Sequence, residues 1–412
     1  MACTGKIIFI WGSFLLISLL NVNRARNLLV ALVCKPSSNP IASGFIQTKD
    51  THFVLNGSPF LFNGFNSYWM MQVAVEPSER YKISNVFREA SVVGLNVCRT
   101  WAFSDGGYQP LQISPGVYDE LVFQALDFVV SEARKYRVRL VLTLTNNLQD
   151  YGGRPQYVQW AKSAGEPVNS DDDFYTNAVT KGYYKNYVEV WVQEMGSYVK
   201  SIDNKHLLGI GMEGFYGDSI QDRKQYNPIP GYQVGTDFIS NNLVKEIDFA
   251  TIHAYPDAWL PGQDDRLQIA FIQRWLTSHW TDSRTILKKP LIFAEFGKSK
   301  TYPGFNISAM DYFLNIVYTN IYNLSKNGGT MGGGLVWQIF TEGMESYYDG
   351  YEIVLSQNPS TTSIIAQQSN KMTKLEHSLN NPHGDIFEKE KIGEYESLES
   401  SHRNYGFYKM IE

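Results

Sequence analysis

The stretch LIFAEFGK, residues 291–298, largely decides the fold that we predict for this sequence. Its four leading apolar residues follow Pro290 and have the continuous hydrophobicity of a strand that is buried on both faces, as in a parallel sheet. The stretch then reaches Glu295. A carboxylate in such a place must be hydrogen-bonded or charge-paired, which shifts its pKa and prepares it for chemistry. A purely structural ion pair with Lys298 or a distant arginine is the competing interpretation.

Other apolar segments along the chain also end in polar or aromatic residues. They span residues 60–66, 95–101, 138–145, 207–212, 247–252 and 334–338, and helix-like segments such as 267–278 and 310–324 lie between them. Strands that alternate with helices indicate parallel strands joined by right-handed crossovers. From residue 207 onward the predicted strands begin about 42 residues apart. We therefore predict one α/β domain, a (β/α)8 barrel of the TIM type.

One interval in this pattern is too short. Residues 138 and 207 are 69 positions apart, which exceeds one strand–helix unit but falls short of the roughly 84 residues that two units would need. The acidic residues 171–173 indicate a helix start, and the helical pattern then continues through residue 199 without a strand. We count seven strands where a closed barrel has eight. The predicted barrel therefore lacks its fourth strand and part of the flanking helices.

Composition excludes several classes of partner. The net charge is −5 and the basic residues form no cluster, so we expect neither nucleic acid nor stable membrane association. The sequence GIGMEG at 209–214 matches a dinucleotide-binding fingerprint, but a Pro-containing loop follows it where the fingerprint requires a helix. No His or Cys pair has metal-ligand spacing. We expect no metal and no cofactor, and the 14% aromatic content hints at a carbohydrate groove.

The chain begins with a predicted leader, residues 1–44. Lys6 precedes the apolar run 7–20, which is shorter than the roughly 18 residues that span a bilayer and is typical of a signal peptide. A second apolar run at 28–34 leaves the cleavage point open, with an uncleaved anchor as the alternative. We expect the barrel at 45–376, a charged tail at 377–412, and a monomer secreted to the extracellular space or cell wall.

The predicted strand ends supply the candidate site. In a barrel of parallel strands the carboxyl ends surround one pocket, so residues that are scattered in sequence converge there. Each candidate alone has a structural explanation, but their shared position at strand ends indicates an active site. These residues are Arg99, Trp101, Asn146, His253, Tyr255, Glu295 and Trp337.

Five motifs at these strands carry a family resemblance. They are NGFNSYW at 63–69, CRTWAFSD at 98–105, HAYPD at 253–257, FAEFGK at 293–298 and GLVWQ at 334–338. Together they resemble the plant endo-β-1,4-mannanases of glycoside hydrolase family 5, over about residues 45–375. The resemblance implies a (β/α)8 barrel that needs no cofactor. It also implies retaining endo-hydrolysis of β-1,4-mannosyl bonds in mannan, galactomannan and glucomannan.

The same resemblance assigns roles to the candidates. Glu295 matches the family nucleophile, and Arg99 and Tyr255 match the residues that hold and ionise it. The lining of the sugar subsites is matched by Trp101, His253 and Trp337. Asn146, at the end of the predicted strand 138–145, remains a candidate substrate-binding residue from its position alone.

The expected acid/base residue is missing from the sequence. A retaining glycosidase needs a protonated carboxyl about 5 to 5.5 Å from its nucleophile. In the family this is the Glu of an Asn-Glu pair at the end of the fourth strand, and this sequence contains no Asn-Glu pair. Glu213 is a nearby carboxylate, although its position on the next strand argues against the required separation. Residues 148–150 also depart from the aromatic-His pair that is common in the family.

Three interpretations therefore stay open. The first is a mannanase family member whose chain lacks the acid/base residue. The second is a polysaccharide-binding protein that keeps the aromatic subsites but has impaired catalysis. The third is a truncated product of splicing or of the gene prediction, in which a segment near residue 187 has been lost.

Overall fold

The structure, a computed structural model, describes residues 44–146, 149–171, 173, 188–229 and 236–381. Apart from Gly44, the predicted leader lies outside these residues, as does nearly all of the predicted charged tail. So do the two residues after Asn146 and most of the segment that links the predicted helix start at 171–173 to residue 187.

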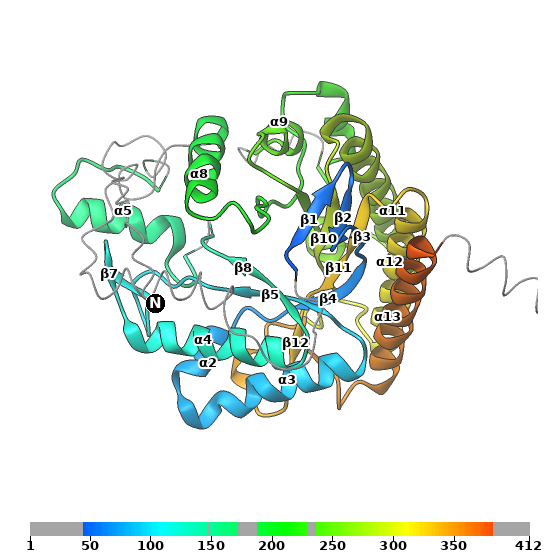
Figure 1. The fold of residues 1–412 in the computed structure, drawn as a ribbon, viewed down its shortest axis with the longest axis horizontal. Helices are drawn as coiled ribbons and strands as arrows, with labels where there is room; N and C mark the ends of the chain where they lie inside the picture. Colours follow the sequence, from blue (N-terminus) through cyan, green and yellow to red (C-terminus); the bar gives the residue numbers. More distant parts are fainter. Residues whose placement is uncertain (1–43, 147–148, 172, 174–187, 230–235, 382–412) are drawn as a thin grey trace, which may run out of the picture.

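A curled sheet of six parallel strands forms the centre of the molecule (Figure 1). In spatial order the strands are β8 (Arg139–Thr143), β5 (Val97–Trp101), β4 (Phe62–Asn66), β11 (Met331–Val336), β10 (Leu291–Phe296) and β9 (Ala250–Ala254). Consecutive strands of the chain are joined through helices, as right-handed crossovers require. The prediction of a parallel α/β barrel sheet is confirmed, and the sheet is part of a (β/α)8 barrel.

Helices cover the outer face of this sheet. In chain order they are α3 (Arg80–Val92), α4 (Glu120–Lys135), α11 (Asp265–Asp282), α12 (Ile307–Lys326) and α13 (Pro359–Asn380). Three of them start with a side-chain cap, because Asp119, Asp264 and Asn306 accept hydrogen bonds from backbone N–H groups of the first turn. Figure 1 shows α11, α12 and α13 side by side along one flank. The last helix runs to Asn380, so the predicted end of the barrel at 376 falls inside it.

Strand β10 lies in the middle of the core. All six of its residues are buried, and it has parallel partners on both sides. Leu291, Phe293 and Phe296 are fully enclosed. Every apolar side chain of this strand is removed from water. The prediction of a strand that is buried on both faces is therefore confirmed.

An antiparallel hairpin precedes the barrel. Its strands are β1 (Ile46–Lys49), β2 (His52–Leu55) and β3 (Ser58–Pro59). Asn56 and Gly57 form the turn between β2 and β3, and both residues have positive φ. Phe53 packs against Phe62 and Phe249, with ring centroids 6.2 and 5.7 Å apart. The hairpin therefore covers the amino ends of the barrel strands and is not part of the barrel sheet.

Shorter elements lie in the connecting segments. They are α2 (Met70–Val75), α5 (Gly153–Ser163), α8 (Val188–Ile202), α9 (Phe238–Leu243) and α10 (Pro256–Trp259), the strand pairs β6 (Gln112–Ser114) with β7 (Val117–Tyr118) and β12 (Ile339–Phe340) with β13 (Ile353–Val354), and the short helices η1 (Pro77–Glu79), η2 (Gln221–Tyr226), η3 (Ser283–Leu287) and η4 (Glu345–Tyr347). Among the described residues, no helix is long and apolar enough to cross a membrane.

The sheet has one open side, which we define as the side between β8 and residues 207–213. Among the described residues, no strand lies between these two segments. Residues 207–213 run beside β9 but make one isolated parallel bridge, between Gly209 and Phe249, so the regular strand predicted at 207–212 is wrong. Gly209 and Gly211 weaken this segment as a strand, and no strand is described on the side that faces away from β9. Both features explain the irregular pairing. All five residues of β8 are partly exposed.

The N-terminal hairpin region contacts both edges of the open side. On one edge, the guanidinium of Arg139 in β8 donates a hydrogen bond to the carbonyl oxygen of Gly44 (3.3 Å). On the other edge, the ring of Phe45 packs edge-on against His206, with centroids 4.8 Å apart. These contacts hold the two edges in position at the amino ends of the strands.

Candidate active site

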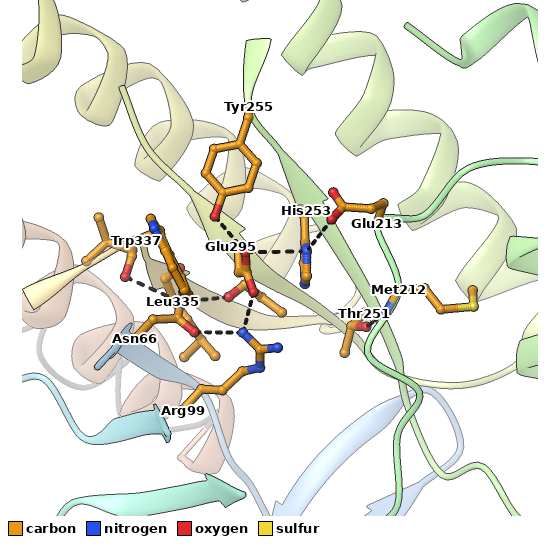
Figure 2. Close-up of polar contacts among 12 residues, drawn as sticks. Asn66, Arg99, Met212, Glu213, Thr251, His253, Tyr255, Glu295, Leu335 and Trp337 are labelled. Carbon is orange, nitrogen blue, oxygen red and sulfur yellow. Dashed lines mark hydrogen bonds and ion pairs between the residues drawn. The ribbon is translucent and has the colours of Figure 1, made fainter. Parts of the chain in front are cut away.

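Glu295 is the centre of a group of polar residues at the carboxyl ends of the strands (Figure 2). One carboxylate oxygen, Oε1, pairs with Nη1 of Arg99, which comes from β5. The other, Oε2, accepts a hydrogen bond of 2.6 Å from the hydroxyl of Tyr255, the residue that follows β9. Three strands that are distant in sequence thus bring their predicted site residues together.

Asn66 links this group to two further strands. Its side-chain oxygen accepts a hydrogen bond of 3.1 Å from Arg99. Its amide nitrogen donates to the carbonyl oxygens of Ala294 (2.9 Å) and Leu335 (3.2 Å). Asn66 therefore fixes the guanidinium against β10 and β11. The sequence-based candidates omitted it, although a polar residue at the end of the predicted strand 60–66 had the same pattern as the others.

The environment of Glu295 favours its ionised form. The residue is only 9% exposed, and burial alone would raise its pKa. The charges of His253 and Arg99 and the hydrogen bonds from Tyr255 and Arg99 outweigh burial, so the pKa lies below its usual value. The carboxylate is therefore an anion at neutral and mildly acidic pH. An anion held in this way can act as a nucleophile or stabilise a developing positive charge.

His253 lies between two carboxylates. Its Nδ1 atom is 3.5 Å from Oε2 of Glu295 and 3.4 Å from Oε1 of Glu213 (Figure 2). The imidazole is buried, whereas the Glu213 side chain is 45% exposed. Sequence reasoning gave His253 a place in the sugar lining, and the structure adds a contact with the central carboxylate.

Aromatic side chains surround the other half of the group. The ring of Tyr68 is stacked with that of Trp337, at the end of β11, with centroids 5.8 Å apart. Tyr68 also lies 4.8 Å from Trp101, which in turn meets the edge of Tyr151 at 4.9 Å. The indole N–H of Trp337 donates to Asp349 (3.3 Å). Sequence reasoning found the two tryptophans but missed both tyrosines, although Tyr68 lies inside the motif at 63–69.

Asn146 behaves differently from the other candidates. It follows β8 on the open side, and its side-chain amide donates to the carbonyl oxygen of Asp150 (3.3 Å). Its own carbonyl accepts from the N–H of Arg154. The contacts described for Asn146 thus lie within its own loop, and it is not among the residues that contact Glu295.

The site contains carboxylates but no evident metal centre. Within the described residues, no group of three or more His, Cys, Asp or Glu side chains could hold a metal ion. Cys98, one residue before Arg99, is buried with a free thiol. The described residues place a carboxylate beside histidine, tyrosine and aromatic rings.

Comparisons with known proteins agree with this fold and site. The family model described as GH family 5 beta-mannosidase-like matches residues 43–186 and 175–346. The chain therefore belongs to glycoside hydrolase family 5, among its β-mannosidase-like members. It is 58% identical to mannan endo-1,4-beta-mannosidase 5 of Solanum lycopersicum, over 84% of this chain and 93% of the relative. It is 45% identical to mannan endo-1,4-beta-mannosidase 7 of Arabidopsis thaliana, over 81% of this chain and 86% of the relative.

Solved structures give the same fold. A glycoside hydrolase family 5 mannosidase from Rhizomucor miehei superposes with a TM-score of 0.68 at 20% identity, covering 82% of this chain and all of that one. The endo-beta-1,4-mannanase from Thermotoga petrophila superposes with a TM-score of 0.63 at 25% identity, covering 80% of this chain and 78% of that one. The six-stranded sheet of this chain therefore corresponds to part of a complete barrel.

Proposed function

We propose that this chain is a secreted endo-β-1,4-mannanase of the retaining type, with Glu295 as its nucleophile. The observation that carries the proposal is the buried, ionised carboxylate held by Arg99 and Tyr255 at the carboxyl end of β10. In a retaining glycosidase such a carboxylate attacks the anomeric carbon and forms a glycosyl intermediate. The names of the plant relatives make mannan the proposed substrate, and the family resemblance of the sequence adds galactomannan and glucomannan.

The aromatic cluster is the proposed sugar-binding surface. Sugar rings present C–H faces that stack on aromatic side chains, and Trp101 and Trp337 lie on the same side of the barrel as Glu295, at strand ends. Asp349 holds the indole of Trp337 through its N–H group. We assign Trp101, Trp337 and His253 to substrate binding, with Arg99 and Tyr255 as the residues that hold the nucleophile.

We also propose that the chain lacks the acid/base residue of the family. The sequence has no Asn-Glu pair, and the family model matches in two pieces that meet at residues 175–186. The alignment with the tomato relative runs over 388 residues but covers 84% of the 412-residue chain, so about 40 of its positions have no counterpart here. That number is about one strand–helix unit of this barrel. Without an acid, cleavage of an unactivated sugar bond loses about 10² to 10⁴ in rate.

A binding protein with impaired catalysis is the second candidate function. The packed rings of Tyr68, Trp101 and Trp337 form without the missing unit. The chain can therefore bind mannan even if it does not hydrolyse it. A truncated splice or gene-prediction product is the remaining alternative. Sequencing the transcript across the codons for residues 187–191 separates it from the other two, because an intact unit in the transcript would make the gap an artefact.

Replacement of Glu295 tests the proposed nucleophile. The parent for this test is the chain with the aligned segment of the tomato relative inserted at the break. Glu295→Gln should abolish mannan hydrolysis and leave mannan binding largely intact, because the amide has a similar shape but cannot form the glycosyl intermediate. Glu345→Gln, at an exposed carboxylate, is the matched control and should have parental activity. Activity of Glu295→Gln within tenfold of the parent would refute the assignment.

Export is the second part of the proposal that needs a test. Lys6 and the apolar run 7–20 support a signal peptide. A reporter fused to residues 1–44 should enter the secretory pathway and lose the leader by cleavage. Cytosolic reporter would contradict secretion, whereas a reporter that stays in the membrane would favour the uncleaved anchor.

A further inference from the structure

The backbone around Glu213 is held firmly against β9 and α11. The N–H of His253 donates to the carbonyl oxygen of Glu213 (3.0 Å), and the N–H of Met212 donates to the hydroxyl of Thr251 (3.3 Å). On the other side, Nε2 of His279 lies 2.7 Å from the carbonyl oxygen of Gly214. Gly214 has φ +102°, and an added Cβ would lie 2.7 Å from Ile252, so only glycine fits there. The position of Glu213 is therefore fixed although its strand is irregular.

The side chains of Glu213 and Glu295 both approach the imidazole of His253 (Figure 2). Both carboxylates lie within 3.5 Å of one atom, Nδ1 of His253, so their nearest described oxygens are at most about 7 Å apart. An added Cβ on Gly211 would lie 4.0 Å from Nη2 of Arg99, so this segment also borders the Arg99 side of the pocket. Paired carboxylates of glycosidases lie about 5 to 5.5 Å apart in retaining enzymes and about 6.5 to 9.5 Å apart in inverting ones.

This separation differs from the one expected from the sequence. The place of Glu213 on the next strand argued against a working distance to Glu295. The structure brings both carboxylates to His253, which serves as a common neighbour. The Glu213 side chain is also 45% exposed, whereas Glu295 is enclosed, so Glu213 can exchange protons with solvent.

We propose that Glu213 is the proton donor for the turnover that this chain retains, an inference that rests on the proposed function. Glu295 attacks the anomeric carbon, and the bond from that carbon to the leaving oxygen breaks with its electron pair on the oxygen. The protonated carboxyl of Glu213 gives its proton to that oxygen. The Glu213 carboxylate then takes a proton from water, and the water oxygen attacks the anomeric carbon and releases Glu295 as a carboxylate. Both carboxyls end in their starting states.

Two substrates in the 412-residue chain test this role. Mannohexaose has an unactivated leaving group and needs an acid, whereas 2,4-dinitrophenyl β-mannoside leaves without a proton. Glu213→Gln should lower kcat/KM on mannohexaose by about 10² and change kcat/KM on the aryl mannoside less than threefold. Added azide should raise the turnover of the aryl mannoside by this variant and yield mannosyl azide.

Controls separate failure of this inference from failure of the proposed function. Glu345→Gln should match the parent on both substrates, and melting curves report whether each variant is folded. Equal losses on the two substrates, an unchanged rate on mannohexaose, or no turnover of mannohexaose by the parent would each overturn the role of Glu213. Retained activity in Glu295→Gln would instead overturn the proposed function.

If Glu213→Gln folds poorly, a comparison of Glu213→Asp with Glu213→Ala provides a second test. Glu213→Asp keeps a carboxyl at this position and should retain more activity on mannohexaose than Glu213→Ala. If the two variants lost the same activity on mannohexaose while both remained folded, Glu213 would have no role as a proton donor.

Discussion

Strands β10 and β8 differ in what surrounds them. Strand β10 has parallel partners on both sides and six buried residues, and Glu295 near its end is held by Arg99 and Tyr255. Strand β8 has a described partner on one side, its five residues are partly exposed, and the Asn146 that follows it bonds within its own loop. Within the described residues, the sheet therefore positions one half of the site between paired strands and leaves the other half beside an edge strand.

Insertion of the missing unit should remove this difference and has the largest expected effect. A chain that receives the aligned segment of the tomato relative should gain up to about 10² in mannan turnover beyond the contribution that we propose for Glu213, because the acid/base Glu of the family returns. Amides of β8 should also become protected from hydrogen exchange, since its free edge gains a partner. Rates on mannan and exchange measured by mass spectrometry check both results.

A flexible insert of equal length is the control for this experiment. A Gly/Ser segment at the same position should leave both the rate and the exchange of β8 unchanged, because it supplies neither a strand nor an acid. If that insert raised mannan turnover as much as the tomato segment, the missing acid would not explain the low activity.

Two leucine-to-alanine substitutions compare how much β10 and β8 contribute to the free energy of unfolding. Leu291→Ala in β10 removes a fully buried side chain and should lower the free energy of unfolding by about 2 to 5 kcal/mol. Leu142→Ala in β8 removes a side chain that is already partly exposed, so a loss below about 1.5 kcal/mol is expected. Urea unfolding of the 412-residue chain gives both values. Equal losses would mean that β8 is packed as tightly as β10.

An effect smaller than that of Leu291→Ala is expected from removal of the hydroxyl of Tyr255. It is one of the groups that lower the pKa of Glu295 against the effect of burial. A lowered pKa stabilises the folded state above the unfolded pKa of about 4.3, and this stabilisation is lost as pH falls through the folded pKa. Tyr255→Phe should therefore cost about 1.5 to 3 kcal/mol near pH 6 and less near pH 3. Melting temperatures across this range measure the difference, and a cost that does not vary with pH would contradict the ionised state of Glu295.

The sequence predicts the ordered half of the site better than the open side. Arg99, Tyr255 and Glu295 were foreseen together because parallel strands end at one edge, whatever their separation along the chain. The bridging role of Asn66 and the packing of Tyr68 were missed, because loop and side-chain contacts depend on tertiary packing that periodicity does not encode.

The strand predicted at 207–212 shows the opposite error. Its apolar pattern is that of a barrel strand, but Gly209 and Gly211 weaken it, and no described strand supports its outer edge. The apolar pattern of residues 207–212 is that of a strand with a neighbour on each side. The observed pairing is irregular because a strand is described on one side only.

The N-terminal hairpin also has a consequence for the order of folding. Residues from Gly44 to Phe60 leave the ribosome before the barrel, but the contact of Phe45 with His206 and that of Phe53 with Phe249 require residues made about 160 to 200 residues later. Contacts so far apart in sequence close slowly, because a long loop must be ordered first. Until then the ring of Phe62 is available to Phe53 but that of Phe249 is not, so the hairpin is synthesised early and completes its contacts late.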